Sequence, residues 1–173
     1  MTHNTINASF VAAAILAVVG TLMLPPGAAA QIPEPIAASG EVTIAQFHGV
    51  GAQVYQCKTG GAGKLAWQFR EPIATLLSDD KTMGRHFAGP TWEFADGTSI
   101  TGKVAASAPG ATRDDIPWLR LAVTSVHGSG PISAATAVQR INTKGGALSG
   151  PCDRAGAFVS VPYAADYIFL HKN

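Results

Sequence analysis

Charged residues are scarce in this chain of 173 residues. They make up 13% of the sequence, whereas soluble domains commonly have about 25%. The formal net charge is +1, and there is no long run of one sign, so the sequence lacks the basic patch typical of nucleic-acid-binding proteins. Disorder is also disfavoured, because it requires low hydrophobicity and high net charge, and 47% of the residues are hydrophobic. We therefore predict a folded domain that binds no nucleic acid.

The amino-terminal segment lacks charge altogether, since no Lys, Arg, Asp or Glu precedes Glu34. Residues 8–24 are almost wholly apolar, a run shorter than the ~20 residues that a membrane-spanning helix prefers. A Pro-Pro-Gly break and the small residues 28–30 follow, as at a signal-peptide cleavage site. We predict a signal peptide over residues 1–30, cut after Ala30, and an exported protein that is periplasmic or extracellular. The alternative is an uncleaved leader, which would then be the only membrane contact.

Cysteine is nearly absent. Cys57 and Cys152 are the only two, and both follow the predicted leader. In an oxidising compartment such a pair predicts one disulfide bond. Two buried free thiols are one alternative, and a catalytic Cys–His pair is another.

The remaining chain lacks long stretches with helical periodicity. Residues 31–46 contain Pro33 and Pro35 near their start and are expected to form an extended arm. Residues 47–173 contain short runs that alternate between apolar and polar residues, separated by turn residues at the spacing usual in sandwiches and barrels. We predict a single all-β domain, an antiparallel sandwich or a partly closed barrel, with at most one short helix.

Two hairpins have recognisable turn sequences. Residues 49–57 and 65–69 alternate on either side of a glycine-rich connection. Asp96 and Gly97 suit a type I′ turn, which needs positive φ at both central residues. Between these hairpins, Gly89-Pro90 predicts a bend, because proline within a central strand would remove a ladder hydrogen bond.

Sequence motifs for common enzyme chemistries are missing. There is no Gly-x-Gly-x-x-Gly dinucleotide fingerprint, no Gly-x-Ser-x-Gly nucleophile elbow and no pair of histidines at metal-ligand spacing. We therefore expect no cofactor and no metal, and we assign no catalytic residue.

Four polar residues form a candidate cluster. His86 and Glu93 flank the Gly-Pro bend, Arg140 lies within a strand-like run, and Asp166 belongs to the last such run. A half-buried arginine needs a partner, and Glu93 and Asp166 are the candidates. We expect His86, Glu93, Arg140 and Asp166 to meet near one end of the sheet, either as a polar site or as a structural ion-paired network.

Aromatic residues make up 8% of the chain, and most are expected in the core. Trp67 lies on the same face of its predicted strand as Leu65 and Phe69, and it is predicted to be a core residue. Trp92, Trp118 and Tyr163 are candidates to line a ligand groove.

Several of these segments, taken in order, resemble a known family. They are Val54-Tyr55-Gln56-Cys57, Trp67-Gln68-Phe69, residues 86–93, Asp96-Gly97, Ile116-Pro117-Trp118-Leu119, residues 139–146, Cys152 and residues 161–167. This set is similar to the secreted bacterial and fungal domain of unknown function 3455, over roughly residues 47–170. The resemblance implies export and carries no established activity, cofactor or catalytic residue.

From these observations we predict a non-catalytic binding or interaction module of the cell envelope or extracellular space. Its partner would be a small molecule, a glycan or an envelope protein. One alternative is a small hydrolase or metal-dependent enzyme that uses His86 and Glu93. Another is a structural surface protein.

Overall fold

The computed structural model describes Met1, residues 31–61 and residues 63–173. Residues 2–30 of the predicted leader lie outside the described residues. Within the described part, no helix is long and apolar enough to cross a membrane.

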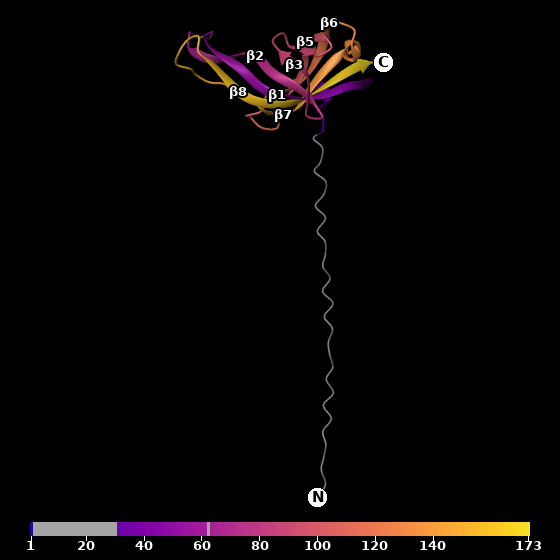
Figure 1. Ribbon diagram of the computed structural model, residues 1–173. Coiled ribbons are helices and arrows are strands. Elements are labelled where there is room, and N and C mark those ends of the chain that lie inside the picture. Colours follow the sequence, from indigo (N-terminus) through magenta and orange to yellow (C-terminus); the bar gives the residue numbers. More distant parts are fainter. Residues whose placement is uncertain (2–30, 62) are drawn as a thin grey trace.

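The prediction of an all-β domain is confirmed, because eight antiparallel strands form one sheet that closes into a ring (Figure 1). Two short 3-10 helices, η1 (Glu34–Ile36) and η2 (Pro131–Ala134), are the helical elements of the described residues. Each strand pairs with the next along the chain, and β8 pairs with β1. The strands are β1 (Glu41–Thr59), β2 (Leu65–Ser78), β3 (Lys81–Phe87), β4 (Thr91–Phe94), β5 (Ser99–Ala108), β6 (Trp118–His127), β7 (Ala137–Gly145) and β8 (Phe158–Lys172).

The strands β1 and β8 form the seam that closes the ring. They are paired from Glu41 with Lys172 to Gln56 with Phe158. On β8, four residues at alternating positions are buried in the interior of the ring, as a strand with one face in the core requires. These are Tyr163, Ala165, Tyr167 and Phe169.

The amino-terminal segment of the domain covers part of the outside of the ring. Ile36 of η1 is fully buried against Ala108 and Trp118. The Gln139 side-chain amide donates a hydrogen bond to the Ile36 carbonyl. The predicted arm therefore packs on the sheet, and the first strand begins at Glu41 rather than at the expected boundary, Phe47.

The type I′ turn lies at a different hairpin from the one predicted. Asp79 and Asp80, between β2 and β3, have φ angles of 47° and 59°, as both central residues of that turn require. At Asp96-Gly97 only Gly97 has a positive φ, of 82°. The Asp96 carboxylate instead accepts a hydrogen bond from the Thr98 backbone N–H at 2.8 Å, which holds Asp96 in a different turn.

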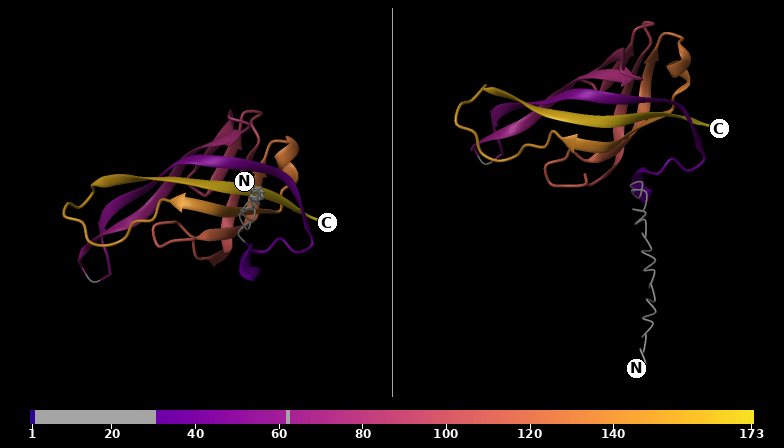
Figure 2. Two further views of the ribbon diagram at one scale, coloured as in Figure 1. Left: turned by 90° about the horizontal axis from the view of Figure 1, so that it is seen from below. Right: turned by 60° about the horizontal axis from the view of Figure 1, so that its bottom comes forward.

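Strand β2 has two neighbours along only part of its length. It pairs with β1 from Leu65 to Leu77, but with β3 only from Ala74 onward. Pro72 lies in the part that β3 does not reach, where a missing N–H costs no ladder bond on that side. In Figure 2, the long strands β1, β2 and β8 extend past the ends of the shorter strands.

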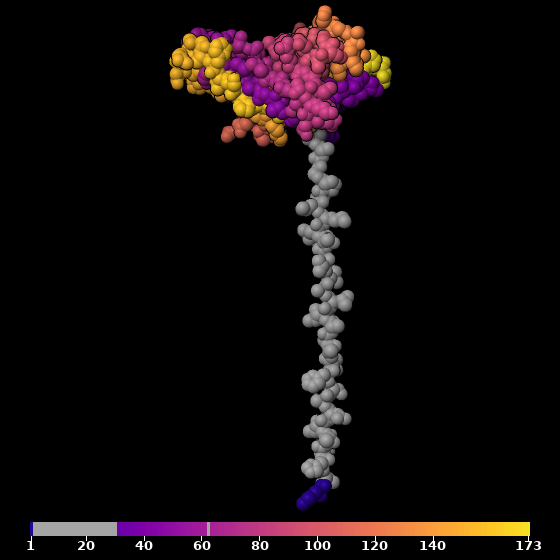
Figure 3. Space-filling view, in the orientation of Figure 1, coloured from indigo at the N-terminus to yellow at the C-terminus, as the bar shows by residue number. Residues whose placement is uncertain are grey.

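The predicted disulfide between Cys57 and Cys152 is confirmed, with Cα atoms 5.9 Å apart. It ties the segment that precedes β8 to the far ends of β1 and β2, at the left of Figures 1 and 3. Backbone hydrogen bonds reinforce the same contact, from Trp67 N–H to the Gly150 carbonyl and from Cys57 N–H to the Ala157 carbonyl.

Replacing both cysteines should destabilise the domain. The bond closes a loop with a sequence separation of 95, and its loss is expected to lower the free energy of unfolding by up to about 4 kcal/mol, since the unfolded chain regains loop entropy. Urea unfolding of a Cys57→Ser, Cys152→Ser variant measures this difference. Reductant should lower the midpoint of the unmodified protein similarly and leave the variant unchanged. Equal midpoints for all samples would contradict the prediction.

Candidate functional site

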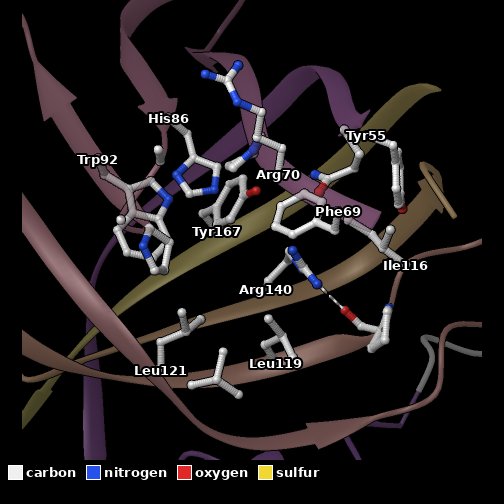
Figure 4. A pocket seen from close by; sticks show the side chains of 17 residues that line it. Tyr55, Phe69, Arg70, His86, Trp92, Ile116, Leu119, Leu121, Arg140 and Tyr167 are labelled. Carbon is white, nitrogen blue, oxygen red and sulfur yellow. Dashed lines mark hydrogen bonds between the residues drawn. The ribbon is translucent and has the colours of Figure 1, made fainter. Parts of the chain in front are cut away.

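A cavity of about 410 Å³ opens into the ring at the place where β2 separates from β3 (Figure 4). Its floor is formed by buried side chains of His86 on β3, Trp92 on β4 and Tyr167 on β8. Its rim includes exposed hydrophobic side chains of Phe69 on β2 and Val104 on β5. The ring is thus filled by side chains on one side and hollow on the other.

Strand alternation explains why the floor is aromatic. His86 and Trp92 are cross-strand partners in the β3–β4 hairpin, so their side chains lie on the same face of the sheet. Both point inward and are only 2% and 0% exposed. Their rings are stacked, with centroids 4.7 Å apart and an angle of 11° between the planes. The Tyr167 ring packs against both, with its centroid 5.0 Å from that of His86 and 5.7 Å from that of Trp92.

His86 is held as a neutral imidazole with a defined tautomer. Its Nδ1 lies 2.9 Å from the Thr91 carbonyl oxygen, which can only accept, so Nδ1 carries the proton. Burial lowers the pKa of His86 from 6.5 to about 4; the Thr91 carbonyl opposes this shift, and the nearby positive charge of Arg140 adds to it. The unprotonated Nε2 is therefore an acceptor at neutral pH.

Arg140 on β7 is the cation of the cavity. Its Nε and Nη2 both donate to the Pro117 carbonyl oxygen, at 3.2 and 2.8 Å. Within the described residues, no carboxylate oxygen lies within 4.0 Å of its guanidinium. Burial lowers the pKa of Arg140, and the neighbouring hydroxyls of Tyr167, Tyr163 and Tyr55 oppose this shift. An arginine remains charged in this setting, so the cavity contains a positive charge without a carboxylate partner.

The tyrosines around Arg140 are neutral at neutral pH. Burial raises the pKa of Tyr167 well above its usual value, and it also raises the pKa of Tyr163. Their hydroxyl oxygens lie 3.0 Å apart. Tyr55 donates to the Gly146 carbonyl at 2.7 Å, and burial raises the pKa of its phenol as well. None of the three phenols therefore compensates the charge of Arg140.

Two further side chains of the cavity have donors without acceptors. The indole N–H of Trp92 and the amide nitrogen of Gln53 are both buried and have no hydrogen-bond partner within the described residues. Unpaired buried donors are costly, and they are commonly satisfied by water or by a ligand.

The structure does not bring the four residues of the predicted polar cluster together. His86 and Arg140 line the cavity, but Glu93 lies outside the ring, where its carboxylate is 2.8 Å from Arg85 Nη2. The reason is that Glu93 follows inward-pointing Trp92, and successive strand residues point to opposite faces.

Asp166 also lies outside the ring, for the same reason, because its neighbours Ala165 and Tyr167 point inward. It is bonded to His48 Nδ1 and to Asn142 Nδ2, each at 2.8 Å.

The three aromatic residues predicted to face a ligand also lie in different surroundings. Trp92 lines the cavity. Trp118 points outward and is buried beneath η1, because its neighbour Leu119 points into the cavity. Tyr163 is a core residue that reaches Tyr167 through its hydroxyl. Trp67, predicted in the core, is half-buried near the disulfide.

Several cavity residues were not identified from the sequence. Gln53 and Tyr55 share an inward face of β1, and Leu119 and Leu121 share one on β6. Alternation groups each pair on one face, but it does not indicate that the two faces border a cavity. Among the residues that the structure describes, no group of three or more His, Cys, Asp or Glu side chains is placed to hold a metal ion.

Comparison with known proteins yields one family. A family model described as "Protein of unknown function (DUF3455)" matches residues 38–82 and 77–171. No curated protein and no solved structure matches the chain.

The neutral state of His86 predicts a pH dependence of stability. Between about pH 6.5 and about pH 4 the unfolded chain binds a proton at this histidine and the folded chain does not. The free energy of unfolding should therefore fall as the pH is lowered through this window, by about 3 kcal/mol in all.

The test compares pH profiles of unfolding for the unmodified protein and for His86→Gln. In the variant, the free energy of unfolding should lose the part of its pH dependence that comes from this histidine. His127→Gln, which alters an exposed histidine, should retain it. Superimposable profiles for the unmodified protein and His86→Gln would show that His86 does not titrate in this way.

Proposed function

The chain belongs to the DUF3455 family of proteins of unknown function, and we propose that it is an exported, non-catalytic module that binds a small molecule in the cavity of its β ring. One observation carries the proposal. The interior is hollow between a buried aromatic floor and an exposed hydrophobic rim, and the hollow opens to solvent.

The size and lining of the cavity support this function. Sites for small molecules usually enclose about 300–1,000 Å³ and have apolar walls with a few polar groups, and this cavity of about 410 Å³ has both properties. A ring of eight strands is wide enough either to be filled by side chains or to hold one small ligand.

The exposed rim gives further support. Phe69 and Val104 are 54% and 50% exposed, although both lie at the cavity opening. A contiguous apolar surface next to a cavity is typical of a binding site. A protein with a purely structural role would be expected to fill its interior to the density of other protein cores.

The geometry gives less support to an enzyme that uses His86 and Glu93. The two side chains lie on opposite sides of the sheet, and Glu93 is paired with Arg85. A general acid and a general base must both reach one substrate, and these two residues do not face the same space.

Export is supported by the leader-like sequence of residues 1–30 and by the disulfide. Disulfide bonds persist in oxidising compartments such as the bacterial periplasm or the extracellular space. A small molecule is preferred over a glycan or an envelope protein because the cavity, of about 410 Å³, lies inside the ring of strands and has the size of a small-molecule site.

A bulky side chain at the rim should block binding. Val104→Trp places an indole at the opening without altering a buried residue. The neutral fluorescent probe N-phenyl-naphthylamine is expected to bind the unmodified protein saturably, with one site per chain. Its affinity for Val104→Trp should be lower by at least about tenfold, because the entrance is obstructed.

Val126→Trp is the matched control, since Val126 is also an exposed strand valine but does not line the cavity. It should bind the probe like the unmodified protein. Probe binding that does not saturate, or that is equal in all three proteins, would overturn the proposal.

A further inference from the structure

We infer that the ligand of this cavity is a small hydrophobic carboxylic acid, bound as a monoanion with its carboxylate on Arg140 and its carbon body against the aromatic and aliphatic walls. This inference rests on the proposed function, because it names the class of molecule that the same site would take.

Arg140 differs from most other arginines of the protein in its charge partners. Four of them lie within 4.0 Å of a carboxylate oxygen, although their side chains are partly or largely exposed. These are Arg70, Arg85, Arg113 and Arg120. Arg140 has its guanidinium inside the ring, and its polar partners within the described residues are the Pro117 carbonyl and the neutral Tyr167 hydroxyl, neither of which carries a charge. A desolvated charge is costly without a counter-charge, so an anionic group placed beside Arg140 would lower that cost.

The guanidinium of Arg140 is accessible from the cavity. In Figure 4 the guanidinium of Arg140 lies in the middle of the cavity, among Tyr167, Phe69 and Leu119, with its bond to a backbone oxygen on one side. That bond uses Nε and Nη2 on the same acceptor. A guanidinium carries five N–H donors, so Arg140 has donors left to form a charge-assisted bond with a carboxylate.

The other polar groups of the lining also suit an anion. Among the described residues that line the cavity there is no Asp or Glu, so an anion meets no carboxylate there. Two buried groups of the lining without a partner among the described residues, the Trp92 indole N–H and the Gln53 amide nitrogen, are donors, whereas the unprotonated Nε2 of His86 is an acceptor. With the positive charge of Arg140 in the lining, an anion is favoured over a cation.

The charge of the ligand follows from counting cations. Arg140 supplies one positive charge, and the other arginine of the lining, Arg70, is already paired with Glu71. His86 is neutral and adds none. A monoanion leaves the site neutral, whereas a phosphate dianion would leave an uncompensated negative charge in a largely apolar cavity.

The body of the ligand follows from the walls. Trp92, Leu119, Leu121 and Phe69 present carbon surface to the cavity. Burying apolar surface contributes roughly 25 cal/mol per Å², which favours a carboxylic acid with a hydrophobic body over a small polar acid such as acetate.

The experiment uses two probes of the same shape, naphthylacetate and naphthylacetamide, which differ in charge. Each is titrated near neutral pH as a competitor of N-phenyl-naphthylamine on the full mature domain. The acid should bind at least about tenfold more tightly than the amide, because only the acid forms the charge-assisted bond. Arg140→Gln should abolish this preference by weakening the acid alone. Arg85→Gln, on the outer face, should preserve it.

A measurement on the unmodified protein covers the case in which Arg140→Gln does not fold. The Nε–H resonance of Arg140 in a ¹⁵N-edited spectrum should shift on addition of the acid and not of the amide. Arg140→Lys identifies that resonance by removing it, and should bind the acid more weakly than the unmodified protein.

The outcomes separate the inference from the proposed function. If the neutral probe binds in the cavity but acid and amide compete equally, the cavity is a binding site and the inference is overturned. A preference that persists in Arg140→Gln also overturns it. If no probe binds at all, the proposed function itself fails.

Discussion

Closure of the sheet through the pairing of β1 with β8 is the constraint on which the rest of the structure depends. This seam places residues near the start of the domain beside residues at its end, from Glu41 and Lys172 onward. It also brings Tyr167 of β8 to the His86–Trp92 hairpin on the opposite wall. Without the seam, the aromatic floor would lack one of its three members, and Arg140 on the neighbouring strand would face solvent instead of a cavity.

The filled and hollow parts of the ring have different roles. In the filled part, Phe47, Phe94 and Phe169 pack at centroid distances of 5.1 to 5.7 Å, which fixes the strands relative to one another. In the hollow part, buried His86 and Arg140 border open space. The stability gained in the first part compensates for polar groups that the second leaves without protein partners.

Much of the fold, and less of the site, follows from the sequence. The all-β domain follows from short alternating runs, which are a local pattern of the sequence. The disulfide follows because two cysteines allow only one pairing. The site depends on register between distant strands. Because Trp92 and Tyr167 point inward, their neighbours Glu93 and Asp166 point outward. Residues that were predicted to form one polar cluster therefore lie on opposite faces of the sheet. Nothing local to β7 indicates that Arg140 borders a cavity, since this requires β2 to leave β3.

The separation of β2 from β3 has a consequence for association between chains. Where β3 ends, residues 68–73 of β2 have no paired strand on the side of the cavity opening within the described part of the chain. An unpaired strand edge can recruit an edge from another chain. This edge carries Arg70, Glu71 and Pro72, two charges and a residue without an N–H, which are the devices that natural sheets use against such pairing. The opening of the cavity is thus also a strand edge, and its sequence disfavours pairing with the edge of a second chain.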